Sequence, residues 1–349
     1  MNESNDDHPA ADRLLDLVSN FAGRRVLVLG DMVADEYIEG RPVRLSREAP
    51  LPVLEWVNRY IVPGGATNLA LNVRALGGEV AVAGVIGADE PGEKLRERLI
   101  EDGIGVEGLA VEAGRPTSTK TRVVGGSSQV VSQQIARIDR VDRTEIGDEA
   151  KGHIMAYLRR AASSFDALII SDYENGVING DIIAAALPLA HAHGLVVTVD
   201  AHGDLWRFKG VTVATPNQDE AAATLGLVLR TDAEVCAAGA TLAAQMDARG
   251  VLITRGSEGM TLVEASGACL HMPAAAPREV RDATGAGDTV SGAVTLALTA
   301  GALLTEAAYL GNLAAGLVVQ HYGAATTTPP ELRAEIIRRS NSSPAASVD

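Results

Sequence analysis

The sequence predicts an α/β protein in which helices cover both faces of a mostly parallel central sheet and a small β-sheet forms a lid. Strand-length apolar runs alternate with helix-length segments along most of the chain. Such alternation is typical of parallel sheets that are buried on both sides. Two stretches, 37–62 and 117–141, break the alternation because they are rich in β-branched and polar residues and lack helical periodicity.

The patterned part of the chain begins with a helix that leads into a strand. Leu14, Leu15, Val18 and Phe21 recur at helical spacing, and the apolar run 25–30 that follows ends in a glycine. Further strands are expected at 80–85, 167–170, 195–199, 211–214 and 250–254. We expect a tail and helix in residues 1–22, one domain in 23–337, and a disordered tail in 338–349.

The two interrupting stretches contain turn residues, so each is expected to form antiparallel hairpin strands. In α/β folds ligands bind near the carboxyl ends of the parallel strands, and a small sheet that projects there acts as a lid. The alternative is a pair of loops with no part in binding.

Composition excludes several classes of protein. With 45 Asp and Glu against 30 Lys and Arg, the chain does not favour binding to nucleic acid or anionic lipid. Its start lacks a secretory signal, and the apolar stretch 293–304 is too short to span a bilayer, so we expect a cytoplasmic protein. Cys236 and Cys269 lack close metal-type spacing, which favours two buried thiols over a disulfide or a zinc site.

The segment 282–289, Asp-Ala-Thr-Gly-Ala-Gly-Asp-Thr, carries the most informative chemistry. A glycine-rich turn opens a long apolar helix expected over 290–304, and the backbone N–H groups of Gly285, Ala286 and Gly287 point outward as a phosphate cradle. Asp288 lies beside the cradle, ionised, where it accepts a proton from a hydroxyl that attacks phosphorus. The alternative is a glycine turn with Asp288 as a favourable helix-start residue.

Two earlier segments offer groups that bind a sugar. Gly64 and Gly65 precede a helix that carries Asn68, and they let a ligand approach the backbone closely. Asp31 and Asp35 follow the first strand, where short carboxylates hydrogen-bond hydroxyl groups or, alternatively, cap a turn.

Two later segments are candidates for the nucleotide and its metal. Asn217 and Glu220 lie three residues apart, so a helix presents both on one face, which suits water-mediated contacts to Mg²⁺ and phosphate. The same pair also matches a capping box. The donor-rich turn 254–259 either holds nucleotide phosphates or makes a hairpin.

Other nucleotide motifs are absent from the sequence. No G-x-G-x-x-G follows the first strand, which disfavours a nicotinamide-dependent enzyme. The segment 87–94 imitates a P-loop but has Glu93 where the lysine belongs.

The ordered set GGATN at 64–68, TPNQDE at 215–220, TRGSEG at 254–259 and DATGAGDT at 282–289 resembles the ribokinase (PfkB) family of carbohydrate kinases. The resemblance runs from about residue 26 to residue 328. It implies a ribokinase-like fold, ATP and Mg²⁺ as cofactors, and a homodimer in which the lids clasp one another. For catalysis the resemblance implies Asp288 as the base and Gly285 to Gly287 as the anion hole. For the nucleotide it implies Mg²⁺ and phosphate contacts from Asn217 and Glu220, with Thr254, Arg255, Gly256, Gly259 and Asn312 nearby. It also implies sugar contacts from Asp35, Gly64, Gly65 and Asn68, and a monovalent-cation site for K⁺ that includes Asp282 and Thr284.

Within the family, segments 30–31, 44–53, 133–139 and 171–173 are most similar to bacterial D-glycero-β-D-manno-heptose 7-phosphate kinases, which implies phosphorylation of an anomeric hydroxyl. Asn175 and His202 stand where such kinases commonly carry lysines. Lys120, Arg122 and Arg137 remain as candidates to hold the substrate phosphate, or are solvated lid charges.

The chain ends without a second, nucleotidyltransferase domain, so we expect a kinase only. Two alternatives stay open for its activity. One is a kinase of another sugar or of a nucleoside, such as a ribokinase or fructokinase. The other is a non-catalytic regulator that binds a sugar or nucleotide.

Overall fold

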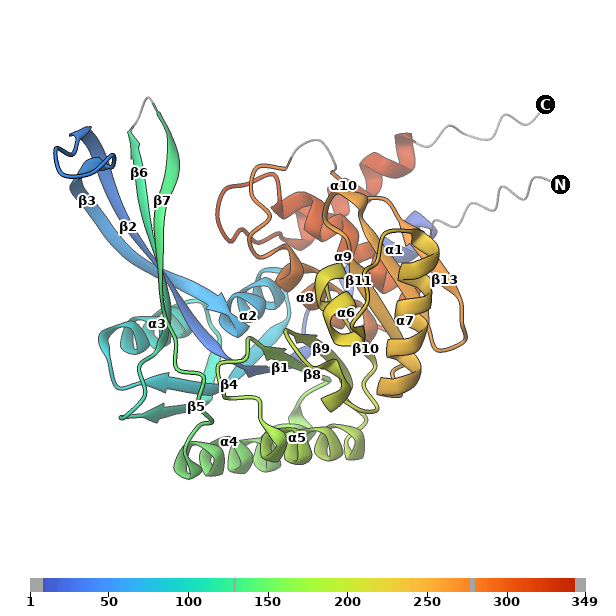
Figure 1. Cartoon of the computed structure of the whole chain (residues 1–349). Helices are drawn as coiled ribbons and strands as arrows, with labels where there is room; N and C mark the ends of the chain where they lie inside the picture. Colours follow the sequence, from blue (N-terminus) through green and yellow to red (C-terminus); the bar gives the residue numbers. More distant parts are fainter. Residues whose placement is uncertain (1–8, 128–129, 277–279, 343–349) are drawn as a thin grey trace.

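The computed structural model describes residues 9–127, 130–276 and 280–342, and Figure 1 shows the whole chain. Within these residues the body is a sheet with the strand order β13-β12-β11-β10-β9-β8-β1-β4-β5, and a second sheet has the order β3-β2-β6-β7. The main sheet is parallel from β5 to β11 and antiparallel only at β12 and β13. The predicted fold class is confirmed.

The strands of the main sheet agree closely with the expected apolar runs, but three of them were not predicted: β5, β12 and β13. β12 and β13 form an antiparallel extension that the alternation of strands and helices does not reveal. The bounds are β1 Arg25–Gly30, β4 Glu79–Gly87, β5 Gly105–Glu112, β8 Ala167–Asp172, β9 Val196–Ala201, β10 Val213–Ala214, β11 Gly250–Thr254, β12 Met260–Glu264 and β13 Cys269–Met272.

Helices cover both faces of this sheet because its central strands are apolar on both sides. In β1, Val26 and Val28 join one apolar cluster, whereas Leu27 and Leu29 join the other. Helices on the first side are α1 Ala11–Ser19, α2 Ala66–Ala75, α3 Glu90–Glu101, α8 Ala286–Thr299, α9 Leu304–Val318 and α10 Pro329–Ser342. Those on the second side are α4 Asp148–Ala161, α5 Gly180–Ala192, α6 Gln218–Leu225 and α7 Asp232–Met246. None of the helices in the described ranges has the length and apolar character needed to cross a membrane.

The second sheet is the predicted lid, and in Figure 1 it projects well away from the body. It consists of β2 Met32–Leu45, β3 Pro52–Gly65, β6 Ser118–Ser127 and β7 Val130–Arg140. β2 and β3 form one antiparallel pair, β6 and β7 form another, and a parallel contact between β2 and β6 joins the two pairs. Both expected hairpins therefore exist, and the first is longer than the predicted 37–62.

The chain order of the strands reverses between β1 and β8. From β1 the sheet continues through β4 and β5 on one side, and from β8 it continues through β9, β10 and β11 on the other. Such a reversal opens a crevice beyond the carboxyl ends of the strands, where α/β proteins bind ligands. The lid begins at this place, since β2 starts two residues after β1 ends.

Two predictions about the C-terminal part of the chain are wrong. The helix expected over 290–304 ends at Thr299, and Gly301 adopts a positive φ of 88° before α9 begins. The tail predicted to be disordered from 338 is helical up to Ser342, because α10 packs its buried Leu332 and Ile336 into the core. The remainder of that predicted tail, 343–349, lies outside the described residues, as does 1–8 of the predicted N-terminal tail.

The prediction of two buried thiols is also wrong. Cys236 of α7 and Cys269 of β13 form a disulfide. Cys236 is half-buried and Cys269 is exposed. The two residues stand 33 positions apart, and only the packing of α7 beside the edge of the sheet brings them together.

Candidate active site

Asp288 lies at the N-terminal end of α8 and is held by side chains from two other parts of the fold. Its carboxylate is buried. The amide of Asn68, on α2, donates to Oδ2 at 2.5 Å, and the hydroxyl of Tyr173, just after β8, donates to Oδ1 at 3.3 Å. Asn68 was predicted as a sugar contact, and the structure places its amide against the predicted base.

Burial raises the pKa of Asp288 to about 6, although the hydrogen bonds from Asn68 and Tyr173 oppose that rise. Burial and the nearby Asp288 charge raise the pKa of Tyr173 well above its usual range, so its hydroxyl stays protonated and can donate. A carboxylate with a pKa of about 6 is ionised at neutral pH, yet it is basic enough to accept a proton during a reaction.

The turn before α8 is open on one side. A Cβ added at Gly287 would meet nothing within 4 Å, whereas one at Gly285 would lie 2.8 Å from Nδ2 of Asn68, and Gly285 has a φ of 79°. No side chain caps the helix, so its first turn is available to an anion. One detail differs from the prediction, because the N–H of Ala286 donates to the carbonyl of Ala283 at 3.2 Å and does not point outward.

Asp31 is a buried residue at the end of β1 that holds a loop in place. Its carboxylate accepts hydrogen bonds from the backbone N–H groups of Tyr173, Asn175 and Val177, at 2.7, 3.1 and 3.3 Å. It was predicted to bind sugar hydroxyls, but the structure turns it toward the loop 173–177, away from open space. Through this loop Asp31 fixes the position of Tyr173.

Asp35, Gly64 and Arg122 meet where the lid joins the body. Arg122 Nη1 lies 2.9 Å from Oδ1 of Asp35, and both side chains are largely buried. Neither of these two atoms has a hydrogen-bond partner of good geometry in the described residues. A Cβ at Gly64 would come within 2.7–2.9 Å of the Asp35 carboxyl group. Since buried polar atoms are normally satisfied, this corner suits a hydroxyl-bearing ligand.

Asn217 and Glu220 form a capping box at the start of α6. This arrangement was the predicted alternative to contacts with Mg²⁺ and phosphate. Glu220 also bonds the ring of His202, which follows β9. The rings of His202 and Tyr173 meet edge to face, with 4.7 Å between their centroids. This chain of contacts joins the segment at 217–220 to the residue that holds Asp288.

Several carboxylates gather on this side of Asp288. Burial, together with the charges of Asp288 and Glu220, raises the pKa of Asp200 to about 7. Acidic oxygens crowded in this way are the hard ligands that Mg²⁺ prefers, either directly or through water. Asp200 and Glu220 are therefore candidates for water-mediated contacts to a divalent cation.

The turn 254–259 closes the antiparallel pair of β11 and β12, as the hairpin alternative expected. The guanidinium of Arg255 bonds Gln218, Asp232 and Glu258, at 3.1, 2.8 and 2.6 Å. Arg255 was predicted to bind nucleotide phosphate, but its donors are engaged within the protein, so it instead ties the turn to α6 and α7.

Two further predicted residues connect loops around the open turn. Asp282 accepts hydrogen bonds from the N–H groups of Thr284 and Gly323, both at 2.9 Å. Asn312, on α9, donates to the carbonyl of Pro273 at 2.8 Å and accepts from the N–H of Ala275 at 3.3 Å. Asp282 thus joins the backbone at Thr284 to that at Gly323, and Asn312 holds the backbone of the segment 273–275.

Three cations of the lid lie on one face. Lys120 and Arg122 are two residues apart on β6, and Arg137 is the partner of Arg122 on β7, so the side chains share a face. Lys120 Nζ lies 4.8 Å from the centre of the Tyr173 ring, and burial lowers the pKa of Lys120. Arg137 pairs with Asp139.

A cavity of about 640 Å³ lies between the lid and the loops around Asp282 and Gly323. Arg122 and Asp282 both line it, so it holds charges of both signs. Its other walls are Tyr37, Glu39, Tyr60, Val62, Val124, Gln134, Thr284, Tyr322, Gly323 and Ala324.

Comparison with known proteins decides the family. Residues 28–331 match the family described as "pfkB family carbohydrate kinase". The chain belongs to this family. The kinase is therefore a phosphotransferase that acts on a sugar hydroxyl.

The kinase is also similar to curated bacterial proteins. It is 42% identical over 307 residues to the bifunctional protein HldE of Geobacter metallireducens, covering 88% of this chain and 61% of that protein. It is 40% identical over 313 residues to HldE of Citrifermentans bemidjiense, covering 89% of this chain and 63% of that protein. The chain thus spans less than two thirds of the length of these relatives.

Solved structures of family members share the fold of the kinase. Phosphofructokinase-2 of Escherichia coli in complex with substrates and products superposes with a TM-score of 0.71 at 20% identity, covering 91% of this chain and 99% of that one. Ribokinase of Arabidopsis thaliana complexed with ribose and ATP superposes with a TM-score of 0.66 at 20% identity, covering 90% and 98%.

Sequence reasoning missed one residue that touches the predicted base of the kinase. Tyr173 lies in a Ser-Asp-Tyr segment that was noted only for its resemblance to heptose kinases. Its position at the carboxyl end of β8, adjacent to β1 in the sheet, was the signal that could have identified it.

Proposed function

We propose that the chain transfers the γ-phosphoryl group of ATP to a hydroxyl of its sugar substrate, with Asp288 as the general base. One observation carries this proposal: a buried carboxylate, held by Asn68 and Tyr173, lies beside an open helix N-terminus. The carboxylate accepts the proton of the attacking hydroxyl, and the open turn at Gly287 receives the phosphate oxygens.

The proposed phosphate donor is ATP bound with Mg²⁺. Glu220 and Asp200 would hold the metal, mainly through water, and Mg²⁺ would neutralise charge on the transferring phosphate. The loops that Asp282 joins would hold K⁺. One solved relative is the E. coli phosphofructokinase-2 in complex with potassium.

The proposed substrate is D-glycero-β-D-manno-heptose 7-phosphate, phosphorylated at its anomeric hydroxyl. The similarity to HldE proteins and the shared face of Lys120, Arg122 and Arg137 support it. A sugar that already carries a phosphate needs such cations, because the net charge of the chain is −15. Asp35, beside Gly64, is the proposed hydroxyl contact.

A substrate screen tests this proposal. The purified chain is assayed for ADP release with ATP and Mg²⁺ against ribose, fructose, a nucleoside, and sugar 6- and 7-phosphates, and product NMR locates the new phosphate. We expect the highest kcat/KM with the heptose 7-phosphate and a product phosphorylated at the anomeric carbon. A preference for unphosphorylated ribose or fructose would refute the heptose assignment and leave the kinase assignment intact.

We also propose a homodimer formed through the lid. The lid exposes large apolar side chains, among them Leu45 (72% exposed) and Trp56 (71% exposed), and burial of such side chains against a second copy would remove apolar surface from water. Size-exclusion chromatography with light scattering should give the mass of a dimer, and Trp56→Glu should give that of a monomer. A wild-type chain that elutes as a monomer at assay concentrations would contradict this proposal.

A further inference from the structure

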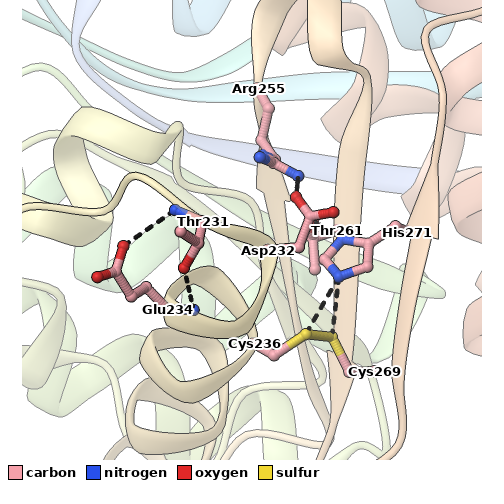
Figure 2. Close-up of a disulfide and its surroundings, with 8 residues drawn as sticks. All are labelled: Thr231, Asp232, Glu234, Cys236, Arg255, Thr261, Cys269 and His271. Carbon is pink, nitrogen blue, oxygen red and sulfur yellow. Dashed lines mark hydrogen bonds and ion pairs between the residues drawn. A yellow bond between two sulfur atoms is a disulfide. The ribbon is translucent and has the colours of Figure 1, made fainter.

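Two cysteines and a histidine gather at the edge of the main sheet, outside the proposed active site. Cys236 lies near the N-terminal end of α7, and Cys269 and His271 lie on β13. Alternate residues of a strand point to the same face, so Cys269 and His271 both point toward α7. Figure 2 shows the imidazole ring beside the disulfide.

The distances from the histidine nitrogen to the two sulfur atoms are close to those in a metal site. Nε2 of His271 lies 3.3 Å from Sγ of Cys236 and 3.9 Å from Sγ of Cys269. In a tetrahedral zinc site, with Zn–S of about 2.3 Å and Zn–N of about 2.0 Å, nitrogen and sulfur ligands are about 3.5 Å apart. The nitrogen therefore already lies near the position that a shared ion requires.

A buried neighbour holds the imidazole in this orientation. Nδ1 of His271 lies 2.8 Å from the hydroxyl oxygen of Thr261, its cross-strand partner on β12, and Thr261 is fully buried. When Nδ1 donates its N–H to this hydroxyl, Nε2 carries a free lone pair toward the sulfur atoms. Histidine ligands of metals are commonly oriented by such a hydrogen bond on the other ring nitrogen.

We propose that Cys236, Cys269 and His271 bind one Zn²⁺ ion when the cysteines are reduced, and that the disulfide is the metal-free, oxidised form of this site. A dithiol reductant gives two electrons and two protons to the S–S bond and becomes a disulfide itself, which leaves two thiols on the protein. Binding of Zn²⁺ then forms two Zn–S bonds and releases the two thiol protons. Nε2 is the third ligand.

The surroundings favour this chemistry. Cys269 and His271 are exposed and Cys236 is half-buried, so reductant and ion both have access, and water completes the coordination. Zinc and the disulfide connect the same two elements, so each fastens the edge strand β13 to α7.

Metal titration of the full chain tests the proposal. The protein is reduced with a phosphine, desalted without oxygen, and titrated with Zn²⁺ against a chromophoric chelator, beside a sample left oxidised. We expect about one tightly bound Zn²⁺ per reduced chain, none per oxidised chain, and a higher Tm for the reduced protein with zinc than without. With Co²⁺ in place of Zn²⁺, the reduced chain should show a thiolate-to-cobalt charge-transfer band.

Variants assign the ligands. Cys236→Ser, Cys269→Ser and His271→Ala should each abolish the tight site, and Thr261→Val should weaken zinc binding roughly 10-fold. His193→Ala, an exposed histidine at the end of α5, is the matched control and should bind zinc normally. The proposal is overturned if reduced wild type binds no zinc, if the oxidised chain or Cys236→Ser binds it equally well, or if the His193 variant loses it.

Discussion

The amide of Asn68 donates a hydrogen bond to the carboxylate of Asp288 across 220 positions of sequence. This contact joins the first helix after the lid hairpin to the glycine turn that opens α8. It keeps the carboxylate pointed at the open turn, with its second oxygen bonded to Tyr173.

Replacing Asp288 by Asn should preserve the shape of this site and remove the proton acceptor. We expect kcat to fall by roughly 10²–10⁴-fold, because a general base typically contributes that much and positioning supplies the rest of the catalysis. Nucleotide Kd, measured by calorimetry, should change little. A variant with near-normal kcat would show that another group takes the proton.

The pH dependence of the reaction should report the raised pKa of Asp288. The base acts only when it is ionised, so log kcat/KM should fall as pH drops below about 6. Asn68→Leu removes a hydrogen bond that stabilises the charged form, so the acid limb should move to higher pH.

The comparison between Asn68→Leu and wild type controls for titration of a substrate phosphate, because both proteins receive the same substrate. Equal acid limbs in the two proteins would indicate that the profile belongs to the sugar phosphate and would remove this evidence for the base.

Gly287→Val should damage the site in a different way. Space around Gly287 is free within 4 Å in the protein, so the variant can fold, but a β-branched side chain would fill the volume assigned to phosphate oxygens. We expect weaker nucleotide binding together with lower kcat, in contrast to Asp288→Asn. Gly180→Val, at another helix start with free space, serves as the control and should keep the wild-type Kd.

Asp31→Ala should act through Tyr173. It leaves three backbone N–H groups of the loop 173–177 without their acceptor, and such a loss costs about 1–3 kcal/mol per group that stays buried. We expect a lower free energy of unfolding in urea and a lower kcat. If Asp31 bound sugar directly, the change would appear chiefly in KM for the sugar, with stability near that of wild type.

Arg137→Gln should discriminate between phosphorylated and unphosphorylated sugars. A charge-assisted hydrogen bond contributes roughly 1.5–3 kcal/mol, so KM for the sugar phosphate should rise by about 10–100-fold and that for an unphosphorylated sugar should not change. Arg41→Gln is the matched control, since Arg41 is also a lid arginine paired with a carboxylate, Glu55. Equal effects of the two variants would mean that Arg137 is a solvated lid charge.

Local patterns were sufficient to predict the fold class. The run 25–30 became β1 and 250–254 became β11 with the predicted bounds, because buried parallel strands have continuous apolar runs that need no partner to be recognised. The lid was recognisable for a similar reason, since β-branched residues and turns outline each hairpin. The motif 282–289 likewise predicted Asp288 in the first turn of a helix from adjacent residues alone.

Only the tertiary structure determines the contacts between residues that lie far apart in the sequence. Strand order places Tyr173 at the end of β8 beside β1, and this brings its hydroxyl to Asp288 and its backbone to Asp31. The packing of α7 against the sheet edge joins Cys236 to Cys269, where sequence spacing predicted separate thiols. Such contacts depend on register and on which face each side chain takes, and a local pattern of polar residues contains neither.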